Sequence, residues 1–146
     1  MRVFGHDTDT TLRQVEAAGR MRPMELIHTC YRITDPDESV AFYEALGFEK
    51  RRELPIRDEA INIFMGLPGD DERLELTYNF GVDSYELGTA YGHIAVSVDD
   101  IDAALAELAK QDITPERPPY TVREGGSRLC FVSDPDGYRV ELIEHG

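Results

Sequence analysis

The hydrophobic pattern of this chain predicts a series of short strands and two helices. Most apolar segments alternate with polar positions at the period of a strand that buries one face. The expected strands are 26–33, 48–54, 60–66, 73–79, 92–98, 114–117, 127–133 and 138–144. Two segments, 38–46 and 101–110, carry their apolar residues at helical spacing instead.

Local signals support these boundaries. Asp35-Pro36-Asp37 precedes the first expected helix and Asp99-Asp100 precedes the second. Aspartate is a favoured N-cap because its side chain accepts a hydrogen bond from the first turn. Gly47 follows the first helix, which is typical of a helix C-terminus. Asp134-Pro-Asp-Gly137 predicts a tight turn between the last two strands.

The order of a strand, a helix and three strands occurs twice along the chain. A shift of 65 residues superposes His28 on His93 and Ile33 on Val98. We therefore predict an α+β domain over 24–146, made of two tandem βαβββ units at about 24–80 and 91–145. Residues 1–23 are expected to be an N-terminal extension with a short helix near 12–18.

Composition narrows the classes of partner. The net charge of −14 argues against nucleic acid, which favours a basic surface. No segment approaches the roughly 18 apolar residues of a membrane span. No basic-then-apolar leader precedes the first charged stretch, so we expect a cytoplasmic protein without a membrane partner. Cys30 and Cys130 lie in apolar segments and are expected to be buried free thiols.

A histidine and a glutamate recur at matching positions of the two units. His28 is followed by Glu75 47 residues later, and His93 is followed by Glu141 48 residues later. Each glutamate has apolar strand neighbours, so its side chain projects to the face that they avoid. A single strand histidine is usually structural, and a single strand glutamate is as readily an exposed carboxylate. Four such residues at matched repeat positions favour a shared site.

Two imidazoles and two carboxylates form a nitrogen and oxygen donor set that suits Zn²⁺, Ni²⁺, Co²⁺ or Mn²⁺. The lack of a thiolate excludes a Cys-rich structural zinc site. An octahedral cation would keep open positions for water or a chelating substrate. It could act as a Lewis acid on a carbonyl and stabilise an enediolate. A carboxylate released from the metal could move a proton between adjacent carbons.

The central segment is similar to that of the glyoxalase I family, the lactoylglutathione lyases. It reads Leu74-Glu-Leu-Thr-Tyr-Asn-Phe-Gly-Val-Asp-Ser-Tyr-Glu-Leu-Gly-Thr-Ala-Tyr-Gly-His-Ile-Ala95. The flanking segments Ile27-His-Thr29 and Phe131-Val-Ser-Asp-Pro-Asp-Gly-Tyr-Arg-Val-Glu-Leu-Ile143 agree with the same family. The resemblance covers about 24–144 and implies the vicinal oxygen chelate fold, which is the paired βαβββ arrangement.

The resemblance also implies a role for each matched acid and base. His28, Glu75, His93 and Glu141 would be the metal ligands. The first pair would come from one subunit and the second pair from its partner, in a homodimer with shared sites. The substrate would be the hemithioacetal of methylglyoxal and a small thiol. Glu141 would be the main general base, which takes the C1 proton of the hemithioacetal and returns a proton to C2. Glu75 would be its counterpart, and the product would be an S-lactoyl thioester.

Three further residues would bind the thiol. Arg32 and Asn79 each lie four residues after a ligand and match positions that hold a γ-glutamyl end. Where relatives often carry a lysine, this chain has Val122-Arg-Glu-Gly-Gly126, so Arg123 would supply the positive charge. The neighbouring Glu124 is unfavourable for an anionic thiol. Two cosubstrates therefore remain possible. One is glutathione, and the other is γ-glutamylcysteine, which we expect if the acidic composition reflects a cytosol with high salt.

The metal and the class each have alternatives. Relatives without long insertions prefer Ni²⁺ or Co²⁺, and this chain lacks such insertions, so these ions are expected, with Zn²⁺ as the other option. An extradiol dioxygenase of this fold uses two histidines and one carboxylate, so Glu75 argues against that class. Acyl-CoA epimerases usually carry glutamine at that position. Non-catalytic ligand-binding members of the fold have no need of the four ligands.

Overall fold

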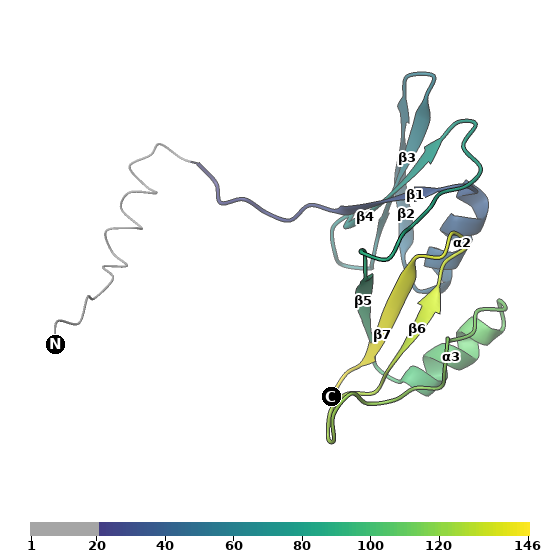
Figure 1. Ribbon diagram of the computed structural model, residues 1–146. Helices are drawn as coiled ribbons and strands as arrows, with labels where there is room; N and C mark the ends of the chain where they lie inside the picture. The colour runs from purple at the N-terminus through teal and green to yellow at the C-terminus, as the bar shows by residue number, and fades with distance from the viewer. Residues whose placement is uncertain (1–20) are drawn as a thin grey trace.

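A computed structural model describes residues 21–146 of the chain. Two small sheets, each accompanied by one helix, lie next to each other, and residues 21–28 lead into the first of them (Figure 1). These leading residues carry no helix or strand. The helix expected near 12–18 lies outside the described residues. The α+β arrangement of two related units agrees with the sequence.

The first unit is a four-stranded sheet with one helix. Its elements are β1 (Thr29–Ile33), α2 (Pro36–Ala45), β2 (Glu49–Ile56), β3 (Ala60–Gly66) and β4 (Leu74–Asn79). The strand order is β1-β4-β3-β2. Strand β1 is parallel to β4, and the other pairs are antiparallel. The parallel pair places the first and last strands of the unit side by side at one edge.

The second unit repeats this order with a smaller sheet. Its elements are β5 (His93–Val98), α3 (Ile101–Ala109), β6 (Leu129–Ser133) and β7 (Arg139–Glu144). The strand order is β5-β7-β6, again with the first and last strands parallel. Both helices begin at the predicted caps. The Asp35 carboxylate accepts from the Glu38 N–H at 3.1 Å, and Asp100 accepts from the Ala103 N–H at 3.0 Å.

The prediction of a strand at 114–117 is wrong. No residue of this segment belongs to a strand, and the isolated bridge to β6 joins Tyr120, which lies after the segment, to Leu129. The Glu116 N–H also donates to the Phe131 carbonyl at 2.9 Å. The prolines at 115, 118 and 119 have no N–H to donate to a ladder, so regular pairing cannot extend between these contacts.

The first strand is shorter than expected and begins after His28. The Thr29 N–H donates to the Arg73 carbonyl at 3.0 Å, where β4 is about to begin. Residues before this bond are not part of the sheet, and Ile27 is 71% exposed. Cys130 is buried as expected, but Cys30 is exposed because it lies on the polar face of β1.

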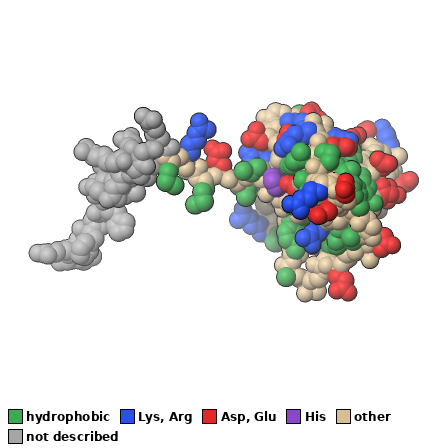
Figure 2. Space-filling view, turned by 90° about the horizontal axis from the view of Figure 1, so that it is seen from above, with side chains coloured by type: hydrophobic (Ala, Val, Ile, Leu, Met, Phe, Trp, Pro, Cys, Tyr) green, Lys and Arg blue, Asp and Glu red, His purple; other side chains and the backbone are tan. Residues whose placement is uncertain are grey.

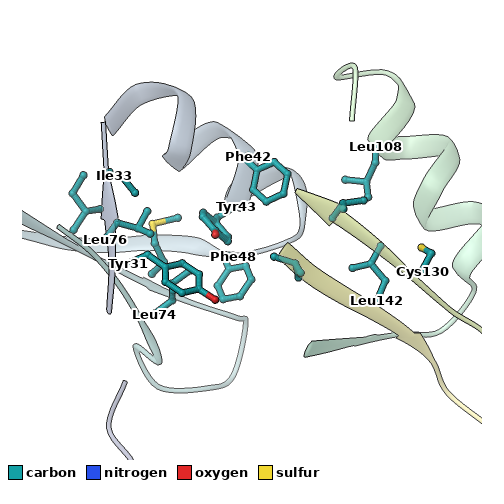
Figure 3. Close-up of a cluster of buried hydrophobic side chains, with 14 of the residues drawn as sticks. Tyr31, Ile33, Phe42, Tyr43, Phe48, Leu74, Leu76, Leu108, Cys130 and Leu142 are labelled. Atoms are coloured by element: carbon teal, nitrogen blue, oxygen red, sulfur yellow. The ribbon is translucent and has the colours of Figure 1, made fainter. Parts of the chain in front are cut away.

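One hydrophobic core joins the two units (Figure 3). Its buried side chains come from both sheets and both helices, including Tyr31, Ile33, Phe42, Tyr43, Phe48, Leu74, Leu76, Leu108, Cys130 and Leu142. The turn between β6 and β7 adds polar contacts, since the Asp136 carboxylate accepts from the Thr34 hydroxyl at 2.5 Å and from its N–H at 3.3 Å. The two units of one chain are therefore held in a defined relation by apolar packing and by this turn.

The outer surface mixes both signs of charge. Figure 2 shows acidic and basic side chains interspersed over one face of the domain. Neither helix of the described part has the length and apolar character that a bilayer crossing requires.

Candidate metal centre

The first sheet brings His28 and Glu75 together at its parallel edge. Cys30 on β1 pairs with Glu75 on β4. His28 lies two positions before Cys30, just outside β1. The His28 Nε2 atom lies 2.6 Å from the Glu75 Oε2 atom. Glu75 is only 9% exposed, although its two strand neighbours point into the core on the opposite face.

The second sheet repeats this relation with His93 and Glu141. Ala95 on β5 pairs with Glu141 on β7, and His93 again lies two positions earlier. The His93 Nε2 atom lies 3.3 Å from the Glu141 Oε1 atom. The same offset across a parallel pair of strands therefore produces the same pairing in both units, as the sequence repeat indicated.

The two pairs remain separate within one chain. Among residues 21–146, no group of three or more His, Cys, Asp and Glu side chains is close enough to hold a metal ion. Each sheet therefore presents one imidazole nitrogen and one carboxylate, which is half of the four-ligand set predicted from the sequence. This donor chemistry fits a divalent ion of the Zn²⁺, Ni²⁺ or Co²⁺ kind.

An aromatic ring and an arginine flank the first histidine. The Phe64 ring packs edge-on to His28, with 6.1 Å between ring centroids. The Arg52 guanidinium covers Phe64 at 3.8 Å from the ring centroid and is paired with Glu72 at 2.9 Å.

The second histidine has an equivalent neighbourhood. Phe131 packs edge-on to His93 at 4.9 Å, and Arg139 covers Phe131 at 3.9 Å. Arg139 also binds Glu116 through two hydrogen bonds of 2.7 and 2.8 Å, which lower the pKa of the Glu116 carboxyl. The two arginines come from different strands, β2 and β7, so this similarity is not a simple consequence of the repeat. Sequence reasoning missed these residues, although Arg139 lies two positions before Glu141, at the spacing of a shared strand face.

The residues predicted to bind the thiol are placed differently from one another. Arg32 is exposed and lies on the same face of β1 as Cys30, which pairs with Glu75. The Asn79 amide donates to the Tyr85 hydroxyl at 3.0 Å. Arg123 lies in an exposed turn closed by a 3.0 Å bond from the Gly126 N–H to its carbonyl. In the described residues no hydrogen bond or ion pair joins Arg123 to either His–Glu pair.

A broad cavity borders the first pair. It has a volume of about 900 Å³ and is lined by side chains from the segment before β1, from β2 and β3, and from the loop before β4. Its lining includes His28, Phe64, Arg51, Arg52 and Arg73. The acidic residues Glu25, Asp71 and Glu72 also line it, so the His28 imidazole borders a hollow of mixed charge.

The paired units, with one His–Glu pair on the same face of each sheet, define a protein of the vicinal oxygen chelate class. The chain belongs to the Glyoxalase/Bleomycin resistance protein/Dioxygenase superfamily, whose family model matches residues 25–142. The predicted fold class and the resemblance to glyoxalase I are confirmed by this match and by the relatives below.

Bacterial relatives match almost over their whole length. The lactoylglutathione lyase of Escherichia coli O157:H7 is 42% identical over 125 residues, covering 83% of this chain and 93% of that protein. The lactoylglutathione lyase of Haemophilus influenzae is 40% identical over 126 residues, with coverages of 84% and 93%. The probable chloroplastic lactoylglutathione lyase of Arabidopsis thaliana is 36% identical, but this chain spans only 36% of its length.

Solved structures show the same relation. Glyoxalase I from Zea mays superposes with a TM-score of 0.77 at 34% identity, covering 84% of this chain and 45% of that one. The trypanothione-dependent glyoxalase I of Leishmania major gives a TM-score of 0.72 at 37% identity, with coverages of 84% and 87%. The chain thus spans less than half of the plant proteins and most of the bacterial and Leishmania ones.

Proposed function

We propose that this protein is a metal-dependent lyase that converts the hemithioacetal of methylglyoxal and a small thiol into the S-lactoyl thioester. The observation that carries this proposal is the recurrence of one His–Glu pair on each sheet, at 2.6 and 3.3 Å. The lactoylglutathione lyases among its relatives favour this reaction over an epimerase, a dioxygenase or a non-catalytic binding protein.

The complete site forms between two copies of the chain. Each described sheet supplies two ligands, and the two pairs of one chain do not meet. In a symmetric homodimer, His28 and Glu75 of one subunit face the second pair of the partner, and the symmetry generates a second equivalent site. This arrangement accounts for the fact that each pair lies on the polar face of its own sheet, away from the core.

A divalent ion, Ni²⁺ or Co²⁺ in preference to Zn²⁺, is the cofactor. His28, Glu75, His93 and Glu141 hold it. When bound, it acts as a Lewis acid toward the oxygens of the substrate. Phe64 and Phe131 pack edge-on to the two imidazoles and help to orient these nitrogen ligands.

Glu141 is the main general base. Glu141 removes the hydrogen from C1 of the hemithioacetal and returns a proton to C2, while the C1 hydroxyl loses its proton and the C2 oxygen gains one. C1 is thereby oxidised to the thioester carbonyl and C2 is reduced to the alcohol, so no external redox partner is consumed. Glu75 serves as the counterpart on the opposite side of the site.

The thiol is recognised through its γ-glutamyl group, which glutathione and γ-glutamylcysteine share. Arg32 is exposed on the ligand face, and its guanidinium suits the α-carboxylate of that group. Asn79 offers an amide on the same sheet, and Arg123 supplies charge from its turn. The relative from Leishmania major depends on a different thiol, trypanothione, so this part of the site varies among relatives.

We place the protein in the cytoplasm. A reduced thiol cosubstrate is maintained there, and both described cysteines are free thiols, as is usual in a reducing compartment.

The test is an assay for thioester formation with metal-stripped full-length protein. The protein receives methylglyoxal with either glutathione or γ-glutamylcysteine, and Ni²⁺, Co²⁺, Zn²⁺ or no metal. Thioester should accumulate only with metal, and the rates rank the ions and the thiols together. Tight metal binding, measured by calorimetry, without thioester from any pair would refute the lyase. A protein that binds no metal would refute the metal centre itself.

A further inference from the structure

The two ligand carboxylates differ in how firmly they are held. One oxygen of Glu75 lies 2.6 Å from His28 and the other lies 3.2 Å from the Thr77 hydroxyl. Among residues 21–146, the only polar side-chain contact of the Glu141 carboxylate is the one with His93, at 3.3 Å. Glu75 is therefore engaged through both oxygens, whereas Glu141 is engaged through one.

The difference arises from a single position in each unit. Thr77 lies two residues after Glu75 on β4, and Ile143 lies two residues after Glu141 on β7. Side chains two positions apart on a strand share one face, so each flanks its carboxylate. Threonine offers a hydroxyl at this place and isoleucine offers only methyl groups. The two units thus share the same ligand types, but only Glu75 has a hydroxyl beside it.

The Thr77 hydroxyl is itself held in place. Its Oγ1 atom lies 2.9 Å from the Asn62 Oδ1 atom on β3, which is a second acceptor for its proton, and 3.2 Å from the Cys30 thiol on β1. A hydroxyl has one proton to donate and two lone pairs that accept. The charged Glu75 carboxylate is the strongest available acceptor for that proton. Contacts from both neighbouring strands therefore keep the hydroxyl beside Glu75.

We propose that Thr77 is a positioning residue that fixes Glu75 as a static metal ligand, and that Ile143 leaves Glu141 free to move between metal and substrate. A carboxylate bound through both oxygens cannot rotate without losing a hydrogen bond, while one bound through a single oxygen can swing toward a substrate carbon. The unequal roles of the two carboxylates thus follow from one hydroxyl. The metal-binding half of this inference stands without the lyase activity, and its kinetic half rests on the proposed function.

The first test compares Thr77→Val, which keeps the shape and removes the hydroxyl, with Thr77→Ser, which keeps the hydroxyl. The full chain is titrated with Ni²⁺ alone, in competition with a chromophoric chelator. Loss of a hydrogen bond to a metal ligand commonly weakens metal binding by about 10- to 100-fold, and we expect this for valine but not for serine. Equal Ni²⁺ affinity in the valine variant and the wild type would overturn the role of Thr77.

The second test adds the missing hydroxyl to the other unit and leaves Thr77 intact. Ile143→Thr is compared with Ile143→Val, which has the same shape without the hydroxyl. Threonine should lower kcat several-fold relative to valine, with little change in KM, because it restrains Glu141. Equal kcat in the two variants would overturn the inference about mobility.

The outcomes separate this inference from the proposed function. If Thr77→Val weakens Ni²⁺ binding while the wild-type protein forms no thioester, the positioning role is supported and the lyase is rejected. If the wild type is active, but Thr77→Val binds Ni²⁺ as Thr77→Ser does and Ile143→Thr has the kcat of Ile143→Val, the lyase is supported and the inference is rejected.

Discussion

The Tyr43 hydroxyl on α2 donates to the Asp134 carboxylate at 2.8 Å, and this bond joins the two units inside the core. Tyr43 is fully buried and Asp134 is 5% exposed. The other carboxylate oxygen accepts the backbone N–H groups of Asp136 and Tyr138, each at 2.9 Å. Burial raises the pKa of Asp134 even though these three donors favour its charged form.

Asp134→Asn should change how stability depends on pH. A carboxyl with a raised folded-state pKa contributes stability that is fully present below its unfolded pKa of about 3.9 and is lost as pH rises through the folded pKa. Asparagine can accept the same two N–H bonds and donate to the Tyr43 oxygen, and it does not titrate there. As pH rises from acidic to neutral, the free energy of unfolding of the variant should therefore increase relative to that of the wild type, as measured by urea denaturation.

Asp102→Asn provides a control of opposite sign. The Arg128 guanidinium, bound at 2.9 and 3.1 Å, lowers the pKa of the exposed Asp102 carboxyl. Its contribution is present above the unfolded pKa and is lost as pH falls through the folded pKa. As pH rises, the free energy of unfolding of this variant should decrease slightly relative to that of the wild type. Parallel curves for both variants would show that neither carboxyl governs the pH dependence.

Mixing two inactive variants should restore activity if the site is shared. His28→Ala damages the first pair, and His93→Ala damages the second. A dimer containing one chain of each kind has one site with both lesions and one intact site. Refolding an equal mixture should therefore recover about a quarter of wild-type activity, since half of the dimers are mixed and half of their sites are intact. No recovery, with mixed dimers detected by native mass spectrometry, would contradict a site between subunits.

Glu141→Gln should abolish most turnover and leave the fold intact. Glutamine keeps the size of the side chain but cannot accept the C1 proton, and the loss of a general base typically costs about 10²- to 10⁴-fold in rate. Initial rates with saturating metal measure the effect. Glu107→Gln, which removes a carboxylate paired with Lys110 on the surface of α3, serves as the control. Near-normal turnover in Glu141→Gln would assign the base elsewhere.

Arg32→Ala should weaken use of the thiol. Loss of a charged hydrogen-bond partner costs roughly 1.5–3 kcal/mol, which is about 10- to 100-fold in kcat/KM. The effect should appear with both γ-glutamyl thiols and mainly in KM. Arg57→Ala is a suitable comparison, because the Arg57 side chain is 84% exposed and pairs only loosely with Glu59 at 3.8 Å. An unchanged KM in Arg32→Ala would place the thiol elsewhere.

Much of the fold could be predicted because its signals are local. Period-two and helical patterns, the caps at Asp35 and Asp100, and the turn before Gly137 each depend on residues close in sequence. The position of Glu75 and Glu141 on the face away from the core follows from apolar strand neighbours. The strand predicted at 114–117 failed because pairing needs donors along the whole segment, and prolines remove them.

Other features could not be predicted because they depend on which strands become neighbours. Cys30 is in an apolar segment, yet it is exposed because β1 turns that side chain to the face of Glu75. The contacts of Thr77 with Asn62 and Cys30 come from the strands on both sides of β4. The stacking of Arg52 on Phe64 similarly requires the antiparallel pairing of β2 with β3.

The sequence by itself determined the repeated unit, the four His and Glu positions and the chemistry that their donor atoms allow, since strand period and residue type are properties of the chain. Only the tertiary structure decided that His28 meets Glu75 and His93 meets Glu141, while the two pairs of one chain stay apart. The physical reason is that the register of the paired strands brings each histidine to its glutamate. Packing of the two sheets around a common core, in contrast, sets their relative orientation and keeps the two pairs apart.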